Sequence, residues 1–340
     1  MRHVKWMNIA LSTALAVCLA VPAYAAGAPE ESAPVQEETA AAYEVVQRGQ
    51  TTPVRVWGQA AELGEDSLTL VNDSEGAPYE SIILDIGEDT MILDAVTGEV
   101  RAFSDIRQDE TLYAWVSPAM TKSLPPITTA ELILCGIAAD YGVPSYAEVQ
   151  AVEETEDGLD VYVSDQMILH LGADTQLLAG PGTTGEAALT DIVPGTRLLS
   201  WYSVVGLSYP AQAAPEKVML FPSSYDGWVS TEGLEITVNG EVLSLTGANA
   251  PRVEDGHLLV PLRALAETLG CQVTWEPYTD RILVEKDGRE LYRLTLGEAQ
   301  AIQGEVTVGL LAAPEATDGV TFVVLDDLIS LHGLKLSQGF

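Results

Sequence analysis

The stretch His257-Leu-Leu-Val-Pro-Leu-Arg-Ala-Leu-Ala-Glu-Thr-Leu-Gly270, followed by Cys271-Gln-Val-Thr-Trp275, decides the fold of the C-terminal third of this chain. Leu258–Val260 is typical of a strand, and Pro261 stands where a helix begins, because its missing N–H costs no hydrogen bond there. Apolar residues then recur at i, i+3, i+4 and i+7, which predicts one apolar helical face; they are Leu262, Leu265, Ala266 and Leu269. Gly270 follows where a left-handed cap is needed, and alternation resumes after it. Residues 257–275 therefore predict a strand, a short helix and a second strand.

Four short motifs follow one another in order through this region. They are Val238-Asn239-Gly240, Val260-Pro261-Leu262-Arg263, Leu269-Gly270 and Val273-Thr274-Trp275. In order and spacing they resemble the copper amine oxidase N-terminal-like family, also called the stalk domain, over residues 234–340. The resemblance implies an α+β domain with a duplicated ββαβ-type element. It also implies a setting outside the cell, because the family is widespread in secreted and surface proteins of Gram-positive bacteria.

A second, weaker copy of the motif follows in the chain. Val323–Gly333 aligns with Val260–Gly270 without a gap, but Val324 replaces the proline and Asp326 replaces the arginine. No tryptophan follows Gly333. We therefore expect a degenerate second half and no site that needs both halves.

The family name suggests copper, but the histidines of this chain argue against it. His3, His170, His257 and His332 fall in separate predicted elements, whereas an imidazole-rich Cu(II) site needs nitrogen ligands that converge. We expect structural or surface roles for the histidines, no metal site and no cofactor.

The N-terminus predicts a secretory signal peptide over residues 1–25. Met1–Lys5 is positively charged, Met7–Val21 is apolar, and Ala23-Tyr-Ala25 is a small-residue cleavage site. The apolar run is short for a membrane span, so we expect a secreted, extracellular protein with no integral span, either free or associated with the cell wall. Cys18 suggests a lipoprotein as the alternative, although Val17 stands where a small residue is preferred.

Acidic residues dominate the composition. The chain has 50 Asp and Glu against 16 Lys and Arg, a formal net charge of −34. Loss of Arg2 and Lys5 with the signal peptide leaves 14 basic residues and a charge of −36. Such a chain repels nucleic acid and anionic lipid. The acids are scattered without the spacing of a calcium loop, and residues 26–49, rich in Ala, Pro and Glu, predict a disordered tether.

An internal repeat fills the middle of the chain. Leu112-Tyr-Ala-Trp115 is echoed by Leu198-Leu-Ser-Trp201, and Phe103-Ser-Asp-Ile106 by Leu189-Thr-Asp-Ile192, at an offset of about 86 residues. Short strands separated by Gly, Asp and Pro turns run through both copies. We predict a mainly β chain with two tandem small barrels, over residues 50–136 and 145–222, and units of this size favour an OB-like fold.

Four residues are candidates for ligand binding. Trp115 and Trp201 occupy equivalent strand positions and either pack in the core or offer an aromatic face to a sugar. Trp228, in a predicted linker over residues 223–233, either packs at a domain interface or binds a ligand. Arg263 either pairs with Glu267 four residues on or binds an acidic ligand.

No sequence motif points to catalysis. The chain has no Gly-x-Ser-x-Gly, no His-Glu-x-x-His and no phosphate loop, and Cys135 and Cys271 are typical of small buried apolar residues rather than of a nucleophile or a disulfide. We therefore expect a non-enzymatic surface or wall-associated protein that binds or scaffolds a cell-wall glycan or another surface protein. The alternatives are an extracellular hydrolase of wall polysaccharide and a weak divalent-metal-binding surface protein.

Overall fold

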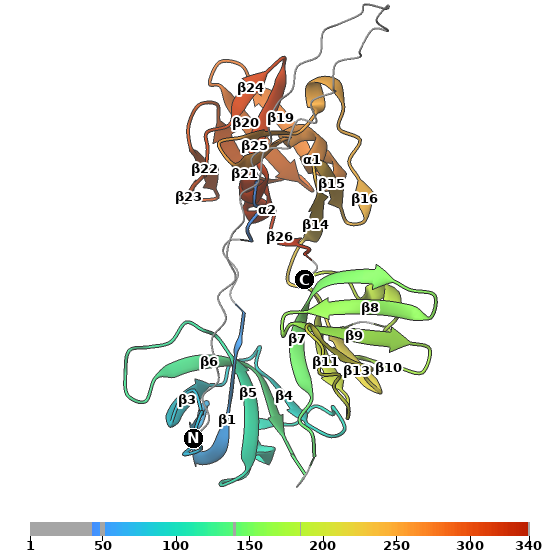
Figure 1. The fold of residues 1–340 in the computed structure, drawn as a ribbon. Coiled ribbons are helices and arrows are strands. Elements are labelled where there is room, and N and C mark those ends of the chain that lie inside the picture. The colour runs from blue at the N-terminus through green and yellow to red at the C-terminus, as the bar shows by residue number, and fades with distance from the viewer. Residues whose placement is uncertain (1–42, 48–51, 139–140, 184, 339–340) are drawn as a thin grey trace, which may run out of the picture. The chain divides into compact units, whose positions relative to one another are not determined.

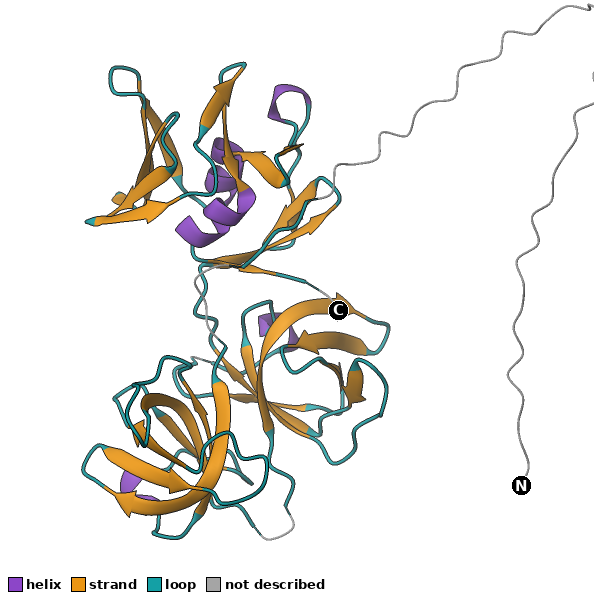
Figure 2. Cartoon of the chain, turned by 60° about the vertical axis from the view of Figure 1, so that its left-hand side comes forward, coloured by secondary structure: helices purple, strands orange, loops and turns teal. Residues whose placement is uncertain are grey.

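The computed structural model describes residues 43–47, 52–138, 141–183 and 185–338 (Figure 1). The predicted signal peptide and most of the predicted tether lie outside these residues. Strands make up 47% of the described chain, which also has two short α-helices (Figure 2). None of the described helices is long and apolar enough to cross a bilayer.

The first repeat forms a closed barrel. Its strands are β1 (Val54–Leu63), β2 (Ser67–Val71), β3 (Ser81–Asp85), β4 (Met91–Asp94), β5 (Thr111–Val116) and β6 (Ile127–Cys135). The sheet order is β3-β2-β1-β5-β6-β4, and β3 also pairs in parallel with β6. That extra pairing closes a ring of five strands, and β4 pairs in parallel with the later residues of β6. A single 3-10 turn, η1 (Phe103–Asp105), lies between β4 and β5.

The second repeat has the same strand order but remains open. Its strands are β7 (Ser145–Glu154), β8 (Gly158–Val163), β9 (Met167–Gly172), β10 (Gln176–Ala179), β11 (Arg197–Trp201), β12 (Ala211–Ala213) and β13 (Lys217–Phe221), with η2 (Leu189–Asp191) before β11. β12 pairs with β9, and β13 pairs with β11 and β10. Together β12 and β13 take the place of the continuous β6. Residues 214–216 interrupt the strand at Pro215, which has no N–H for a sheet hydrogen bond, so this unit is a half-barrel.

The repeat extends to single hydrogen bonds. Thr90 Oγ1 accepts from Gly87 N (2.9 Å) and donates to the Ala130 carbonyl (2.7 Å). Thr175 Oγ1 makes the same two bonds with Gly172 N and the Pro215 carbonyl. The repeat predicted from the sequence is thus also a repeat of local structure.

The C-terminal third combines three small sheets with two helices. One sheet has the order β16-β15-β14-β26, the second β17-β18-β25-β24 and the third β19-β20-β21-β22-β23. The elements are β14 (Gly227–Glu232), β15 (Glu235–Val238), β16 (Glu241–Val242), η3 (Gly247–Asn249), β17 (Arg252–Glu254), β18 (His257–Pro261), α1 (Leu262–Thr268), β19 (Gln272–Glu276), β20 (Arg281–Lys286), β21 (Arg289–Thr295), β22 (Gln300–Gln303), β23 (Val306–Gly309), β24 (Glu315–Thr317), β25 (Val320–Val324), α2 (Leu325–Leu331) and β26 (Leu334–Leu336).

The predicted strand, helix and strand of residues 257–275 are present as β18, α1 and β19. Pro261 ends β18 and precedes α1 as its N-cap, one position before the predicted one. The second copy repeats this geometry, because Val324 precedes α2 as Pro261 precedes α1. Gly270 and Gly333 have φ angles of 77° and 63°, the left-handed conformation that ends a helix.

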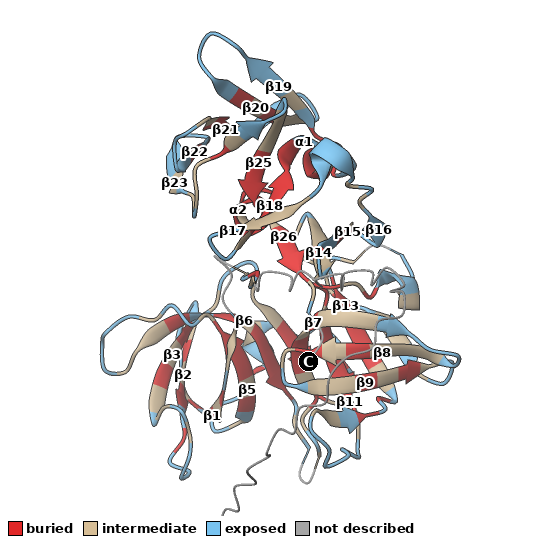
Figure 3. Cartoon of the chain, turned by 45° about the horizontal axis from the view of Figure 1, so that its top comes forward, coloured by how far each residue is buried: buried red, intermediate tan, exposed pale blue. Residues whose placement is uncertain are grey.

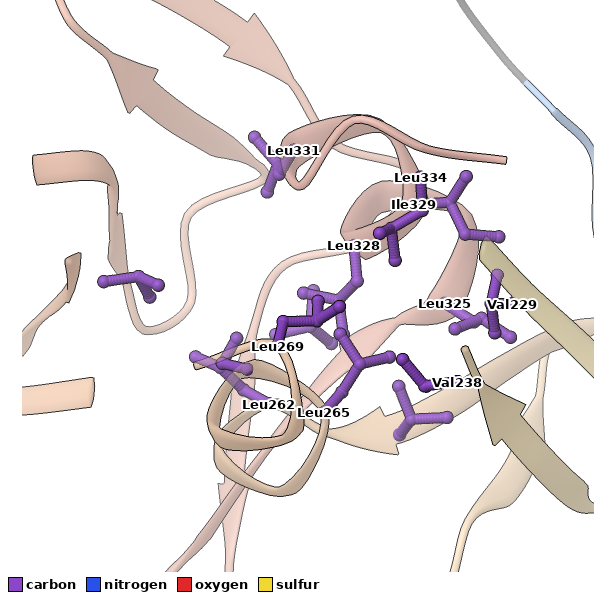
Figure 4. Close-up of a cluster of buried hydrophobic side chains, with 14 of the residues drawn as sticks. Val229, Val238, Leu262, Leu265, Leu269, Leu325, Leu328, Ile329, Leu331 and Leu334 are labelled. Carbon is purple, nitrogen blue, oxygen red and sulfur yellow. The ribbon is translucent and has the colours of Figure 1, made fainter. Parts of the chain in front are cut away.

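The apolar faces of the two helices meet in one core (Figure 4). Leu262 and Leu265 from α1 and Leu325 and Leu328 from α2 are all fully buried. Strand side chains surround them, and Figure 3 shows the buried positions in the strands of the three sheets and of both β units. Because these positions recur at helical spacing in both copies, the core follows directly from the sequence pattern.

Two predicted boundaries need correction. The linker predicted over residues 223–233 contains β14, whose Val229 is fully buried between β15 and β26. The tether predicted over residues 26–49 is wrong at residues 43–47, where Val45 is only 5% exposed and belongs to the core of the C-terminal third. Both segments are short, and composition alone suggested loops. Val46 bonds to Asp326, 280 residues away, and β14 pairs with the distant β26 as well as with the adjacent β15.

Candidate functional site

Trp115 and Trp201 are buried in the core. Their exposed fractions are 5% and 6%, and they share a buried cluster with Tyr146, Met219 and other side chains. Trp201 Nε1 donates to the Ala95 carbonyl at 2.7 Å, so its polar atom is also satisfied. Of the two predicted roles, the structure supports core packing, and the sugar-stacking role does not fit these buried rings.

Trp228 has a structural place in β14. The backbone N–H of Trp228 donates to Asn239 Oδ1 at 2.8 Å, and the Trp228 carbonyl accepts from the Asn239 backbone N–H at 2.9 Å. The indole is partly exposed. These bonds fix the turn at Asn239 and Gly240, which belongs to the first of the four sequence motifs.

Arg263 lies on the exposed side of α1, where the predicted ion pair is confirmed. Its Nη1 is 3.1 Å from Oε1 of Glu267, and both side chains are more than half exposed. Such a pair contributes a few tenths of a kcal/mol. Its guanidinium is therefore free to exchange partners, and Arg263 also lines a groove.

The groove lies between the start of α1, strand β19 and the turn joining β24 to β25. Its volume is about 440 Å³, within the range of small-molecule sites. The apolar lining includes Leu262, Val273, Trp275, Ile282, Leu296 and Val320, and Asn249, Arg263 and Thr321 supply polar groups. We call it the Trp275 groove.

Local structure explains why Trp275 belongs to this groove. Alternate residues of a strand point to the same face, so Val273 and Trp275 of β19 lie together. Trp275 pairs across the sheet with Ile282 of β20, which also lines the groove. The indole remains 40% exposed, which gives a ligand access to an aromatic ring held on regular strands.

The charge of the Trp275 groove differs from that of the chain. In the part of the chain that the structure describes, no Asp or Glu lines it, and Arg263 is its one charged lining residue. The chain as a whole carries 50 acidic residues. A ligand that is neutral or anionic and has an apolar face therefore fits the groove better than a cation.

Trp275 belongs to one of the four sequence motifs, but it is not among the predicted binding residues. The usable signal was its i, i+2 relation to Val273. That relation gives a shared face but does not say whether the face is covered, because the β24–β25 turn comes about forty residues later.

Residues 237–338 match the family model of the copper amine oxidase N-terminal domain. The resemblance predicted from the sequence is confirmed for the C-terminal third. No curated protein and no solved structure was found to be significantly similar to the chain. The match to the copper amine oxidase N-terminal domain begins within β15, so it leaves out β14 and residues 43–47. It includes all the lining residues of the Trp275 groove, among them Arg263 and Trp275.

Despite the name of the matching family, the described residues of this chain do not fit a copper ion. They contain no group of three or more His, Cys, Asp or Glu that could hold a metal. His257 lies on β18, and His332 is buried and bonded to Tyr292. His170 lies on β9 in the second β unit, 2.7 Å from Asp160. The predicted separation into different elements is confirmed for His170, His257 and His332, and His3 lies outside the described residues.

The two described cysteines behave as the sequence predicted. Cys135 and Cys271 are buried and not bonded to each other. Burial raises the pKa of the Cys135 thiol to about 11, so the thiol stays protonated near neutral pH and is a poor nucleophile.

Proposed function

We propose that this chain is a secreted, non-enzymatic binding or scaffold protein of the bacterial surface or cell wall, and that the Trp275 groove binds its ligand. One observation carries the proposal: a half-exposed tryptophan in an apolar groove that has no acidic lining residue. The predicted signal peptide supports the extracellular setting. The match to the copper amine oxidase N-terminal domain is compatible with a role that is not catalytic.

The ligand class that we propose is a cell-wall glycan. A sugar ring has an apolar C–H face that packs on an indole, and hydroxyls that need hydrogen-bonding partners at the rim. Trp275 supplies the aromatic face, and Arg263 and Thr321 supply polar groups. A hydrolase would instead need two carboxylates facing its groove, and no carboxylate lines this one in the described chain.

We further propose that the β units act as OB-like spacers or supports for this binding domain. The five-stranded ring of the first unit, with β3 parallel to β6, fits the OB-type barrel. The second unit follows the same order and differs by the interruption at Pro215. In this proposal, residues 50–136 and 145–222 are separate modules ahead of the C-terminal domain.

Co-sedimentation with purified Gram-positive cell walls tests the function. The protein is residues 26–340, and the variants are Trp275→Ala and, as a matched control, Tyr278→Ala. Tyr278 is 99% exposed and lies three residues after Trp275, outside the groove lining. We expect saturable wild-type binding in moderate salt, at least about tenfold weaker binding for Trp275→Ala, corresponding to about 1.4 kcal/mol, and unchanged binding for Tyr278→Ala.

Three outcomes would contradict the proposal. They are the absence of wild-type binding, equal binding by Trp275→Ala, and binding only when calcium is present. The last would indicate cation bridging through the acidic surface rather than recognition by the groove.

A further inference from the structure

Residues 43–47 lie on the C-terminal third as an extended segment with alternating burial. Tyr43 and Gln47 are partly buried and Val45 is 5% exposed, whereas Glu44 and Val46 are exposed. Burial of every second residue is the pattern of an extended chain with one face against a surface. We call Tyr43–Gln47 the N-terminal segment.

The main chain of the N-terminal segment is held by side chains of the C-terminal third. The Val46 N–H donates to Oδ1 of Asp326 at 2.7 Å. Nε2 of Gln338 donates to the Val45 carbonyl at 3.3 Å. Backbone contacts of this kind recognise an extended conformation whatever the side chain at that position.

Gln47 binds the open edge of β26. Its Nε2 donates to the Leu334 carbonyl at 3.0 Å, and its Oε1 accepts from the Leu336 N–H. β26 is the terminal strand of its sheet, and an open edge leaves N–H and C=O groups without partners. One amide side chain therefore replaces a neighbouring strand there, a task that needs both a donor and an acceptor.

Asp326 links this contact to the degenerate second copy. It takes the position of Arg263 in the first copy, but it is 2% exposed, whereas the Arg263 side chain is more than half exposed. Its Oδ2 is a buried atom without a hydrogen bond. A buried carboxylate costs free energy unless it accepts hydrogen bonds. The bond from the Val46 N–H lowers this cost, and the Asp that replaces Arg in the second copy thereby holds the N-terminal segment.

We propose that the C-terminal third carries a peptide-binding site for an extended segment of the pattern Tyr-x-Val-x-Gln, and that the N-terminal segment is its occupant within the chain. Val45 is the buried anchor, Gln47 forms hydrogen bonds with the edge of β26, and Asp326 accepts a hydrogen bond from the Val46 N–H. Val46 and Asp326 are separated by 280 residues, so the site recognises its occupant through space and accepts the same sequence as a free peptide.

The test uses residues 26–340 and a fluorescent peptide with the sequence of residues 41–49. An occupant in the same chain competes with the free peptide as an intramolecular ligand, so wild-type protein should exclude the peptide. The variant Val45→Asp/Gln47→Ala empties the site. We expect it to bind the peptide at least about tenfold more tightly than wild type, and a peptide with Asp in place of Val45 should bind neither protein.

Equal binding to both proteins, or no binding to a variant whose melting shows a folded C-terminal third, would overturn the proposal. If the variant destabilises this third, peptide must raise its melting temperature in a concentration-dependent way, since a ligand stabilises the state that it binds. An unchanged melting temperature would then overturn the proposal as well.

Discussion

The Tyr292 hydroxyl lies 2.7 Å from Nε2 of His332, and both side chains are buried in the C-terminal third. Burial is the main cause that lowers the pKa of His332, to about 4. Nε2 of a neutral imidazole accepts from the hydroxyl or donates to it according to the tautomer, whereas the protonated ring only donates. Protonation would place a charge in this buried site, which costs free energy.

This pair predicts a loss of stability in acid. The pKa of His332 is about 4 in the fold and about 6.5 when unfolded, so between these values the unfolded chain binds more protons. The free energy of unfolding should therefore fall by up to about 3 kcal/mol as pH drops from 6.5 to 4. The measurement is denaturant unfolding at several pH values for wild type and His332→Gln.

The comparison between the two proteins isolates this residue from the many carboxylates. The stability difference, wild type minus variant, should shrink as pH falls through this window and then level off. A difference that is constant from pH 7.5 to pH 4 would show that His332 does not titrate between these states.

The tryptophans show what sequence cannot say about a single residue. Trp201 and Trp275 both lie at or near the end of a strand, β11 and β19, yet their exposed fractions are 6% and 40%. The difference arises from partners far away in the chain: Trp201 donates to Ala95, which lies 106 residues away. Periodicity gives the face of a strand, but only the tertiary structure decides whether that face is covered.

At the scale of elements, α1 and α2 were predictable because their signals are local. The apolar spacing and the following glycine lie within eleven residues of each other, and both helices begin at the aligned positions Leu262 and Leu325. β14 was not predictable in the same way. It pairs with the adjacent β15 and in parallel with the distant β26, Gly227 opposite Leu334. Residues 223–227 contain two Ser, an Asp and a Gly, so the start of this short strand resembles a linker.

Leu265→Asp tests the importance of the α1 face. Leu265 is fully buried between the helices, and an unpaired buried carboxylate should cost at least about 4 kcal/mol. We expect the C-terminal third to unfold, seen as the loss of its transition in thermal melting and of its slow hydrogen exchange.

The matched control is Thr268→Asp, an exposed position on the same helix. A carboxylate at the C-terminal end of α1 opposes the helix dipole by about 0.3–1 kcal/mol and the substitution removes the Thr268 bond to the Ala264 carbonyl. This variant should therefore lose about 1–2 kcal/mol of stability, well below the loss expected for Leu265→Asp. Unchanged melting of Leu265→Asp would mean that α1 does not pack as the structure has it.

At the scale of the whole molecule, the acidic residues act together. The chain carries a formal charge of −34, and like charges at this density destabilise a compact state through self-repulsion. Few of them pair with cations, because only 16 Lys and Arg are present. The composition alone gives the net negative charge of the chain. It does not show that the described lining of the Trp275 groove contains no acidic residue.

Salt should therefore stabilise the protein, and the choice of cation separates screening from specific binding. The Debye length falls from about 30 Å at 0.01 M to about 8 Å at 0.15 M ionic strength, so NaCl should raise the melting temperature over this range. The described residues hold no cluster suited to a metal, so CaCl₂ and MgCl₂ at equal ionic strength should raise it equally. A melting temperature that does not rise with NaCl would contradict the role of self-repulsion. A larger shift with calcium than with magnesium would instead favour a calcium site, since only a ligand that binds the folded state adds stability beyond screening.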